Sequence, residues 1–253
     1  MGAFDQVDEV PRRVMVLFFI VDTSASMNGE KIASLNVAVR EVIPTVSELA
    51  AENSDALIKI AVMEFSSGME WMYPQPIEVE KFQWRDLEAG GLTCLGEACT
   101  ELCTQLSTKA YMAEPTGSFA PAIILMSDGE PTDDYKRGLE KLKGNPWFRD
   151  AIKVAIAIGN DANQDILAEF TGNSEAVLTV HNKEQLKKII HFVSVRSSIE
   201  GSKRASVGKD APDTKQEVFV EKIKEELAND KTLNGVDVGT DVPTDNDSDW
   251  DNW

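Results

Sequence analysis

The sequence is poor in residues on which many active centres depend. Its 253 residues include only two histidines and three cysteines. Two histidines leave little room for a histidine-rich metal site or for acid–base chemistry. No two cysteines have the CxxC spacing, which excludes a zinc ribbon. Cys94, Cys99 and Cys103 fall within ten residues, and we expect them to be small buried thiols in a reducing compartment.

Basic residues and long apolar runs are also scarce. The chain has 25 basic against 43 acidic residues, a net charge of −18, which argues against a nucleic-acid partner or an anionic membrane. The longest apolar run, residues 14–21, is far shorter than the roughly twenty residues of a membrane helix. No cleavage site follows it, and the N-terminus lacks a myristoylation pattern. We therefore expect a soluble, cytoplasmic protein.

The hydrophobic share of 42% can build a core, and the chain alternates between two kinds of pattern. Apolar, β-branched runs predict strands at 14–21, 56–65, 120–126, 153–158 and 176–180. Apolar spacings of three and four predict helices at 30–51, 95–106, 165–170 and 184–199, the first kinked by Pro44. Residues 69–79 hold two prolines, which suits an edge strand. The alternation predicts a three-layer α/β/α sandwich around a Rossmann-like, doubly wound, mostly parallel sheet with an antiparallel edge strand.

Composition divides the chain into five segments. Residues 1–13 are polar, and 14–200 carry the pattern of the folded domain. A polar linker follows at 201–214, and 215–228 is a short helix candidate. Residues 229–253 hold seven aspartates and one lysine, and we expect this tail to be disordered because it has little apolar surface to bury.

The most informative residues directly follow the first buried strand. Asp22, Ser24 and Ser26 offer one carboxylate and two hydroxyls from a single turn. In a parallel α/β sheet, ligands bind at this carboxyl edge. Hard oxygen ligands of this kind suit Mg²⁺. The alternative is that the same side chains cap the helix that begins near Gly29.

Two further segments favour the metal. Thr93 follows a glycine turn before a helix, and Asp128 directly follows the fourth predicted strand. If that strand lies beside the first, Asp22 and Asp128 flank one crevice, where the connections leave in opposite directions. Neighbouring carboxylates repel unless a cation or a proton lies between them. The sequence therefore predicts a cation between the two strands.

Three segments together resemble a known family. VDTSASM (21–27), GGLTCLGEAC (90–99) and LMSDGEPTDD (125–134) are similar to the three parts of the metal-ion-dependent adhesion site of von Willebrand factor A (vWA) domains, and the resemblance covers residues 14–199. It implies that Ser24, Ser26 and Thr93 supply hydroxyl ligands and that Asp22 and Asp128 bind the ion directly or through water. Mg²⁺ is the implied metal, with Mn²⁺ and Ca²⁺ as alternatives.

Within this family, the chain looks most like small bacterial vWA proteins of tellurium-resistance and stress operons. The resemblance implies a scaffold or regulator, not an enzyme, that binds an acidic side chain of a partner through the metal. Protein kinases and PP2C-type phosphatases of the same operon are the implied partners.

Four residues are candidates for contacts with such a partner. Met27 and Glu130 lie beside the motifs, although a solvated acidic loop is the simpler interpretation of Glu130, Asp133 and Asp134. Trp250 and Trp253 stand among aspartates of the tail, a pattern of aromatic anchors with acidic steering. A tail that only keeps the protein soluble is the alternative.

Two other functions stay open. A Mg²⁺-dependent phosphohydrolase would use Asp22 as its nucleophile, but haloacid-dehalogenase-type enzymes have a second aspartate where this chain has Ser24. An adaptor for a chaperone-like ATPase would share the metal site and differ in its partner. The sequence has no nucleotide-binding glycine motif.

Overall fold

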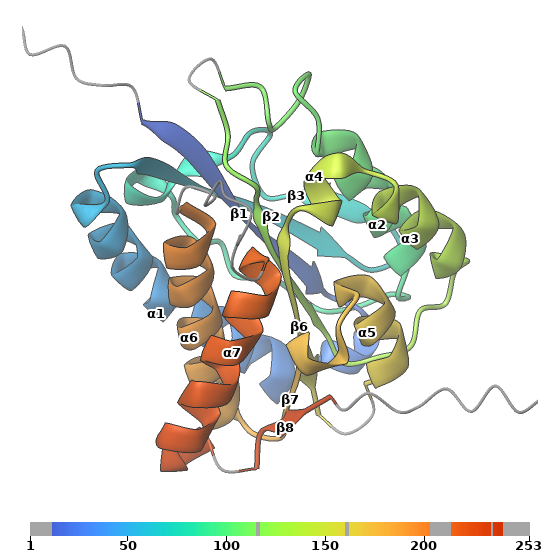
Figure 1. Cartoon of the computed structure of the whole chain (residues 1–253). Coiled ribbons are helices and arrows are strands. Elements are labelled where there is room, and N and C mark those ends of the chain that lie inside the picture. Colours follow the sequence, from blue (N-terminus) through green and yellow to red (C-terminus); the bar gives the residue numbers. More distant parts are fainter. Residues whose placement is uncertain (1–11, 115–116, 160–161, 203–213, 234, 240–253) are drawn as a thin grey trace, which may run out of the picture.

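A single mixed β-sheet forms the centre of the molecule (Figure 1). The computed structural model describes residues 12–114, 117–159, 162–202, 214–233 and 235–239. Within these ranges the sheet has eight strands in the order β3-β2-β1-β5-β6-β7-β8, and β4 also pairs with β2. In chain order they are β1 (Arg13–Asp22), β2 (Ala56–Phe65), β3 (Met69–Trp71), β4 (Ile77–Glu78), β5 (Ala122–Ser127), β6 (Ile152–Ile158), β7 (Val177–Val180) and β8 (Asp237–Val238).

The pairing of the strands confirms the predicted fold class. The five long inner strands run parallel to one another. The short strands β3 and β4 run antiparallel to β2, as the prolines near them suggested. The opposite edge also has an antiparallel strand, β8, which the sequence did not reveal because two residues carry no periodic pattern.

Helices cover both faces of the sheet, so the molecule has three layers (Figure 1). One face is covered by α1, α6 and α7, and the other by α2, α3, α4 and α5. Their bounds are α1 (Glu30–Glu52), α2 (Leu95–Gln105), α3 (Tyr135–Lys143), α4 (Pro146–Arg149), α5 (Gln164–Thr171), α6 (Lys183–Ser202) and α7 (Lys215–Asn229), with 3-10 turns η1 (Ala25–Met27), η2 (Val79–Lys81), η3 (Ser174–Ala176) and η4 (Lys231–Leu233).

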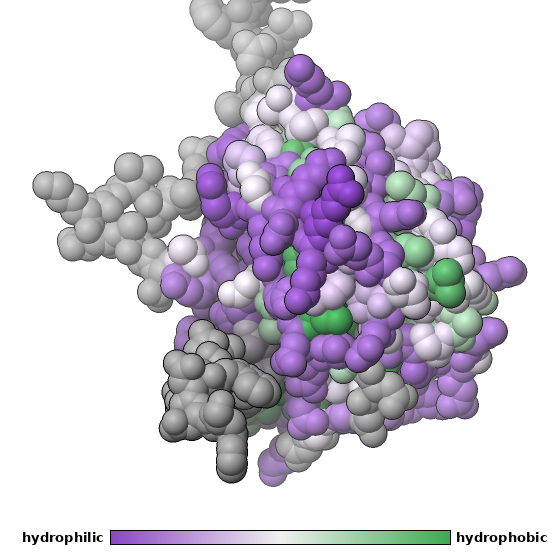
Figure 2. Space-filling model, turned by 90° about the vertical axis from the view of Figure 1, so that its right-hand side faces the viewer, coloured by the Kyte–Doolittle hydropathy of each residue, from purple (hydrophilic) through white to green (hydrophobic). Residues whose placement is uncertain are grey.

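Strand β1 separates the two layers of core. Every residue of 14–21 is at most 1% exposed, which confirms a strand buried on both faces. Successive side chains alternate: Phe19 packs on the α1 side and Phe18 on the α2 side. The outer surface over α2 to α5 is mainly hydrophilic with scattered hydrophobic groups (Figure 2). The hydrophobic core therefore lies between the layers, on both sides of the sheet.

The C-terminal part departs from the expected organisation. Helix α7 is confirmed, and Phe219 and Ile223 on it are fully buried in the same core as α1 and α6. The expectation of a disordered segment after residue 229 is wrong for η4 and β8, because Leu233 is buried and β8 pairs with β7. Residues 240–253 lie outside the described part.

The helices differ from expectation in two further places. Helix α1 continues through Pro44 to Glu52 as one element. Helices α3 and α4 were not predicted, since α3 is short, highly charged and contains Gly138. In the described part of the chain, no helix is both long and apolar enough to cross a membrane.

The strand order places the candidate residues together. Strands β1 and β5 are adjacent and parallel, and they end at Asp22 and Ser127. From this edge the chain continues from β1 to α1 on one face and from β5 to α3 on the other. The loops after these two strands therefore meet at the point where the connections diverge.

Candidate metal centre

Asp22 is a buried carboxylate held by two hydrogen bonds. Its Oδ1 accepts the backbone N–H of Ser24 at 2.8 Å, and its Oδ2 accepts the hydroxyl of Ser127 at 2.6 Å. Burial raises the pKa of the Asp22 carboxyl, the bonds from Ser127 and Ser24 oppose that rise, and the charge of Asp128 adds to it. Burial therefore disfavours the ionised form of Asp22.

Two hydroxyls connect the loop after β1 to Asp128. The Oγ atoms of Ser24 and Ser26 lie 3.0 Å apart, and the Ser26 hydroxyl donates to Oδ1 of Asp128 at 2.7 Å. Ser24 and Asp128 are buried, whereas Ser26 is exposed. Side chains about a hundred positions apart in the sequence therefore form one continuous row of oxygens.

The capping alternative does not hold in the structure. Helix α1 begins after Gly29, which has no side chain to cap it. Ser24 stands at the start of η1 but makes no side-chain cap bond there. Neither serine is needed to satisfy a helix end; the two hydroxyls instead lie against each other, and that of Ser26 also against Asp128.

Thr93 approaches the same site from the loop before α2. A side-chain carbon built at Gly129 would lie 3.4 Å from Ser26 Oγ and 4.0 Å from Thr93 Oγ1, so both hydroxyls border the space beside this glycine. The backbone of Thr93 is fixed by Thr132: its N–H donates to the Thr132 hydroxyl at 3.1 Å, and its carbonyl accepts the Thr132 N–H at 2.8 Å. The structure thus brings Thr93 close to the serines.

Sequence reasoning missed two residues at this site. Lys31, in the first turn of α1, forms an ion pair with Oδ2 of Asp128. Ser127, the last residue of β5, donates to Asp22. The position of Ser127 beside Asp128 could have drawn attention to it. Nothing in the sequence pairs Lys31 with a carboxylate 97 residues away.

Three of the five predicted residues, Ser24, Ser26 and Asp128, have oxygen separations that suit a hard divalent cation. Ligands at about 2.0–2.1 Å in an octahedron place neighbouring oxygens about 3 Å apart. The Ser24 and Ser26 hydroxyls have this separation, and Oδ1 of Asp128 is close to it. Among the described residues, no three His, Cys, Asp or Glu side chains gather at a metal-binding distance. A cation here would therefore depend on hydroxyl oxygens as well as carboxylates.

The partner candidates have different outcomes. The prediction that Met27 lies on a contact rim is wrong, because η1 turns its side chain into the core, where it is fully buried. Glu130 is exposed beside the site and accepts a hydrogen bond from Asn163 at 3.1 Å. Trp250 and Trp253 lie outside the described residues.

Asp133 is not simply a solvated member of the acidic loop. Its carboxylate accepts the backbone N–H groups of Gly96 and Glu97, at 3.1 and 3.0 Å. These are N–H groups of the first turn of α2, which have no partner within the helix. Asp133 therefore ties the loop after β5 to the helix that follows Thr93.

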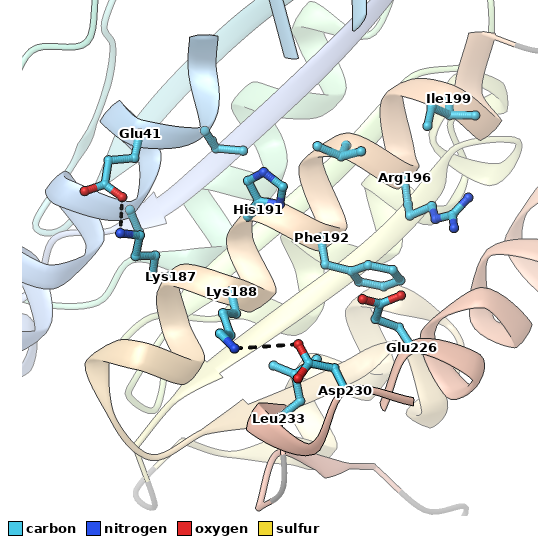
Figure 3. Close-up of a pocket in the computed structure, with 13 residues that line it drawn as sticks. Glu41, Lys187, Lys188, His191, Phe192, Arg196, Ile199, Glu226, Asp230 and Leu233 are labelled. Carbon is cyan, nitrogen blue, oxygen red and sulfur yellow. Dashed lines mark ion pairs between the residues drawn. The ribbon is translucent and has the colours of Figure 1, made fainter. Parts of the chain in front are cut away.

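A cavity of the described part lies elsewhere. It has a volume of about 530 Å³ and lies between α1, α6 and the end of α7 (Figure 3). On its rim Glu41 pairs with Lys187, and Lys188 with Asp230 at 3.6 Å. None of its lining residues belongs to the three loops of the candidate site.

The fold and the site together define a class: a doubly wound α/β domain with hydroxyls and carboxylates converging at its switch point. The family model of the von Willebrand factor type A domain matches residues 17–191. The chain belongs to this family. None of the curated proteins compared with it matches the chain.

Solved structures share the fold at low identity. A von Willebrand factor type A protein from Catenulispora acidiphila is 19% identical with a TM-score of 0.55, over 74% of this chain and 43% of that one. The ArnB paralog VWA2 from Sulfolobus acidocaldarius is 22% identical with a TM-score of 0.51, over 70% and 44%. Proximal thread matrix protein 1 from the mussel byssus was solved with zinc in its metal-ion-dependent adhesion site (MIDAS) motif. It is 18% identical with a TM-score of 0.55, over 73% of this chain and 48% of that one. The chain spans less than half the length of each.

Proposed function

We propose that this chain is a divalent-metal-dependent protein-binding module, acting as a scaffold or regulator in a bacterial stress-response or signalling system. The observation that carries the proposal is the convergence of Asp22, Ser24, Ser26 and Asp128 from the ends of two neighbouring strands. Membership of the vWA family supports it, because members of that family bind proteins through a metal held by these motifs.

Most of the residues that would hold the ion carry no charge. Ser24, Ser26 and Thr93 contribute neutral hydroxyls, and Asp22 and Asp128 contribute the two carboxylates. Bound there, the cation would stay electrophilic and accept a carboxylate from a partner. Ser127 holds Asp22 in place through its hydrogen bond, and Asp133 holds the loop that carries Asp128 against α2.

Mg²⁺ is the ion that we propose, with Mn²⁺ and Ca²⁺ as alternatives. The ligand set consists of oxygens only, which favours hard cations. The zinc in the mussel protein shows that a related motif can hold a divalent ion in that protein. A direct comparison of these metals would settle the preference.

For partners, we propose a protein that presents a carboxylate, with a protein kinase or a PP2C-type phosphatase as the first candidates. This part depends on the resemblance to proteins of tellurium-resistance operons. Glu130 is exposed beside the site and could contact the partner, and Trp250 and Trp253 would add aromatic anchors. An adaptor role toward a chaperone-like ATPase would use the same site. The three free thiols, of which Cys94 and Cys99 are buried, support a cytoplasmic location.

The geometry gives little support to a phosphohydrolase. Asp22, the proposed nucleophile of such an enzyme, is fully buried, and both of its oxygens accept hydrogen bonds. A substrate phosphorus could not reach it without displacing Ser127 or the turn at Ser24. We therefore assign binding, and not hydrolysis, to the site.

The decisive experiment measures metal and partner binding with the same variants. Titration calorimetry of Mg²⁺, Mn²⁺ and Ca²⁺ into wild type and Asp22→Asn tests the ion. Capture from cells of the source organism, with Mg²⁺ or with EDTA, then tests the partner. We expect a partner that is retained by wild type in Mg²⁺ and lost both in EDTA and with Asp22→Asn. Phosphatase turnover that Asp22→Asn abolishes would instead establish the enzyme.

A further inference from the structure

The ammonium group of Lys31 lies against Asp128, one of the proposed metal ligands. That group pairs with Oδ2 of Asp128, whose side chain is fully buried, while the lysine side chain is 31% exposed. The other carboxylate oxygen accepts the Ser26 hydroxyl at 2.7 Å. Both oxygens of Asp128 are therefore engaged, one by a proposed metal ligand and one by a positive charge that the chain itself supplies.

We propose that Lys31 is a resident cation that competes with the divalent ion for Asp128 and so sets the metal affinity of the site. The proposal rests on the metal-binding function proposed above. In the metal-free protein the ammonium neutralises a buried carboxylate that also faces the charge of Asp22. A divalent ion that enters the site meets a positive charge already in place, and like charges at short range repel strongly in a partly buried setting.

The side chain of Lys31 passes beside Gly159, which has no side chain to obstruct it. Gly159 follows β6 and has a φ of +90°, and a carbon built there would lie 3.5 Å from Lys31 Cε and 3.7 Å from its Nζ. The lysine stem thus passes over a bare backbone between α1 and the end of β6. A flexible four-carbon stem on an otherwise rigid helix start can change its partner without moving the fold.

A second place for the ammonium lies next to the first. Lys31 also lines a cavity of about 290 Å³ between the starts of α1 and α6, beside Gly159. The acidic residues Glu30 and Glu184 line the same cavity, together with Lys183. When a divalent ion takes over Asp128, the ammonium can turn into this cavity and keep an acidic neighbour. Displacement then costs less than leaving the lysine without a counter-charge.

The test compares metal affinities by titration calorimetry with MgCl₂ or MnCl₂ alone. Lys31→Met and Lys31→Gln remove the charge, Lys31→Arg keeps it, and Lys136→Met removes an exposed lysine from the first turn of α3. We expect the two neutral variants to bind at least about tenfold more tightly than wild type. Lys31→Arg stays near wild type, and Lys136→Met changes Kd by less than about twofold, because solvent and salt screen an exposed charge.

Thermal unfolding in EDTA supplies a second readout. Because the neutral variants leave a buried carboxylate without its ion pair, we expect their metal-free Tm to fall by about 5–10 °C. Saturating metal restores most of that loss. Equal or weaker metal binding by Lys31→Met and Lys31→Gln would overturn the proposal while leaving the binding function intact. Absence of metal binding in wild type and in both neutral variants would instead overturn the proposed function, and this inference with it.

A double-mutant cycle tests the second position of the ammonium. Glu184→Gln should weaken metal binding by about two- to threefold in wild type and have no effect in the Lys31→Met background. An equal effect in both backgrounds would mean that Glu184 acts on the metal without Lys31, and would remove the cavity from the proposal.

Discussion

Oδ2 of Asp22 at the end of β1 accepts the hydroxyl of Ser127 at the end of β5, at 2.6 Å. The bond joins the two strands whose loops carry the proposed ligands. It also fixes the orientation of the Asp22 carboxylate, which is fully buried. The pair therefore connects the register of the sheet directly to the geometry of the candidate metal centre.

The first prediction concerns metal binding by Asp22. Asp22→Asn should weaken Mg²⁺ binding by more than about 100-fold, since it removes a charged ligand. In EDTA its Tm should not fall below that of wild type, because burial disfavours the ionised form of Asp22. For wild type, metal at about 100 times its Kd should add about 2.7 kcal/mol of stability. Calorimetry measures the affinity and thermal unfolding the two effects on stability, and undiminished Mg²⁺ binding by Asp22→Asn would contradict the assignment of this ligand.

The second prediction concerns the contact between α2 and α3. A side-chain carbon on Gly138 would lie 2.1 Å from the carbonyl oxygen of Gly96, so the helices cross with bare backbones in contact. Gly138→Ala should destabilise the protein by about 2–3 kcal/mol, although alanine favours helices by about 1 kcal/mol. Gly144→Ala, with a nearest contact of 3.4 Å, is the matched control and should change stability by less than about 1 kcal/mol. Denaturant unfolding gives both values, and equal effects would disprove the close crossing.

The third prediction concerns thiol reactivity and its dependence on pH. Burial raises the pKa of the Cys99 thiol from 9.0 to about 12, whereas Cys103 is only partly buried. Iodoacetamide at pH 8 should therefore modify Cys103 in the native protein and reach Cys99 only after unfolding. Mass spectrometry of alkylated peptides measures the order, and early modification of Cys99 would contradict it.

The raised pKa of Cys99 also makes the stability of the protein depend on pH. The pKa of Cys99 is higher in the folded protein than in the unfolded chain, so the folded state favours the neutral thiol. The free energy of unfolding is therefore unaffected by this thiol below pH 9 and falls as the pH rises from 9 toward 12, because the unfolded chain loses the proton first. The free energy of unfolding of wild type should fall more steeply over this range than that of Cys99→Ala. Parallel pH profiles of the two proteins would show that the thiol does not titrate differently in the two states.

The fourth prediction concerns the acidic tail. Deletion of 240–253 should leave Tm within about 2 °C of wild type, because the buried side chains of the described core precede it. A deletion after Leu227 should be destabilising, since it also removes Leu233 and β8. If Trp250 and Trp253 anchor the partner, the short deletion and the double alanine variant both weaken its retention on the immobilised chain. Unchanged retention would assign the tail to solubility alone.

The residues of the site differ in how far the sequence predicts them. Asp22, Ser24 and Ser26 lie in one turn, so a local pattern after a buried strand reveals them. Asp128 required the further assumption that its strand lies beside the first, which the pairing of β1 with β5 confirms. Lys31 could not be found in this way, because its partner depends on how α1 meets the end of β6. Met27 was misplaced because its side chain on η1 packs into the core instead of facing solvent.

The sequence by itself determined the order of the five inner strands and of helices α1, α2, α5 and α6, the burial of the first strand on both faces and the class of the family, because periodicity and short motifs are local properties. Only the tertiary structure decided the rest: that Ser127 and Lys31 hold the two carboxylates, that Asp133 caps α2, and that the segment after α7 adds a strand to the sheet. Each of these depends on contacts between parts of the chain distant in sequence, whose partners are set by packing and not by any pattern in the residues themselves.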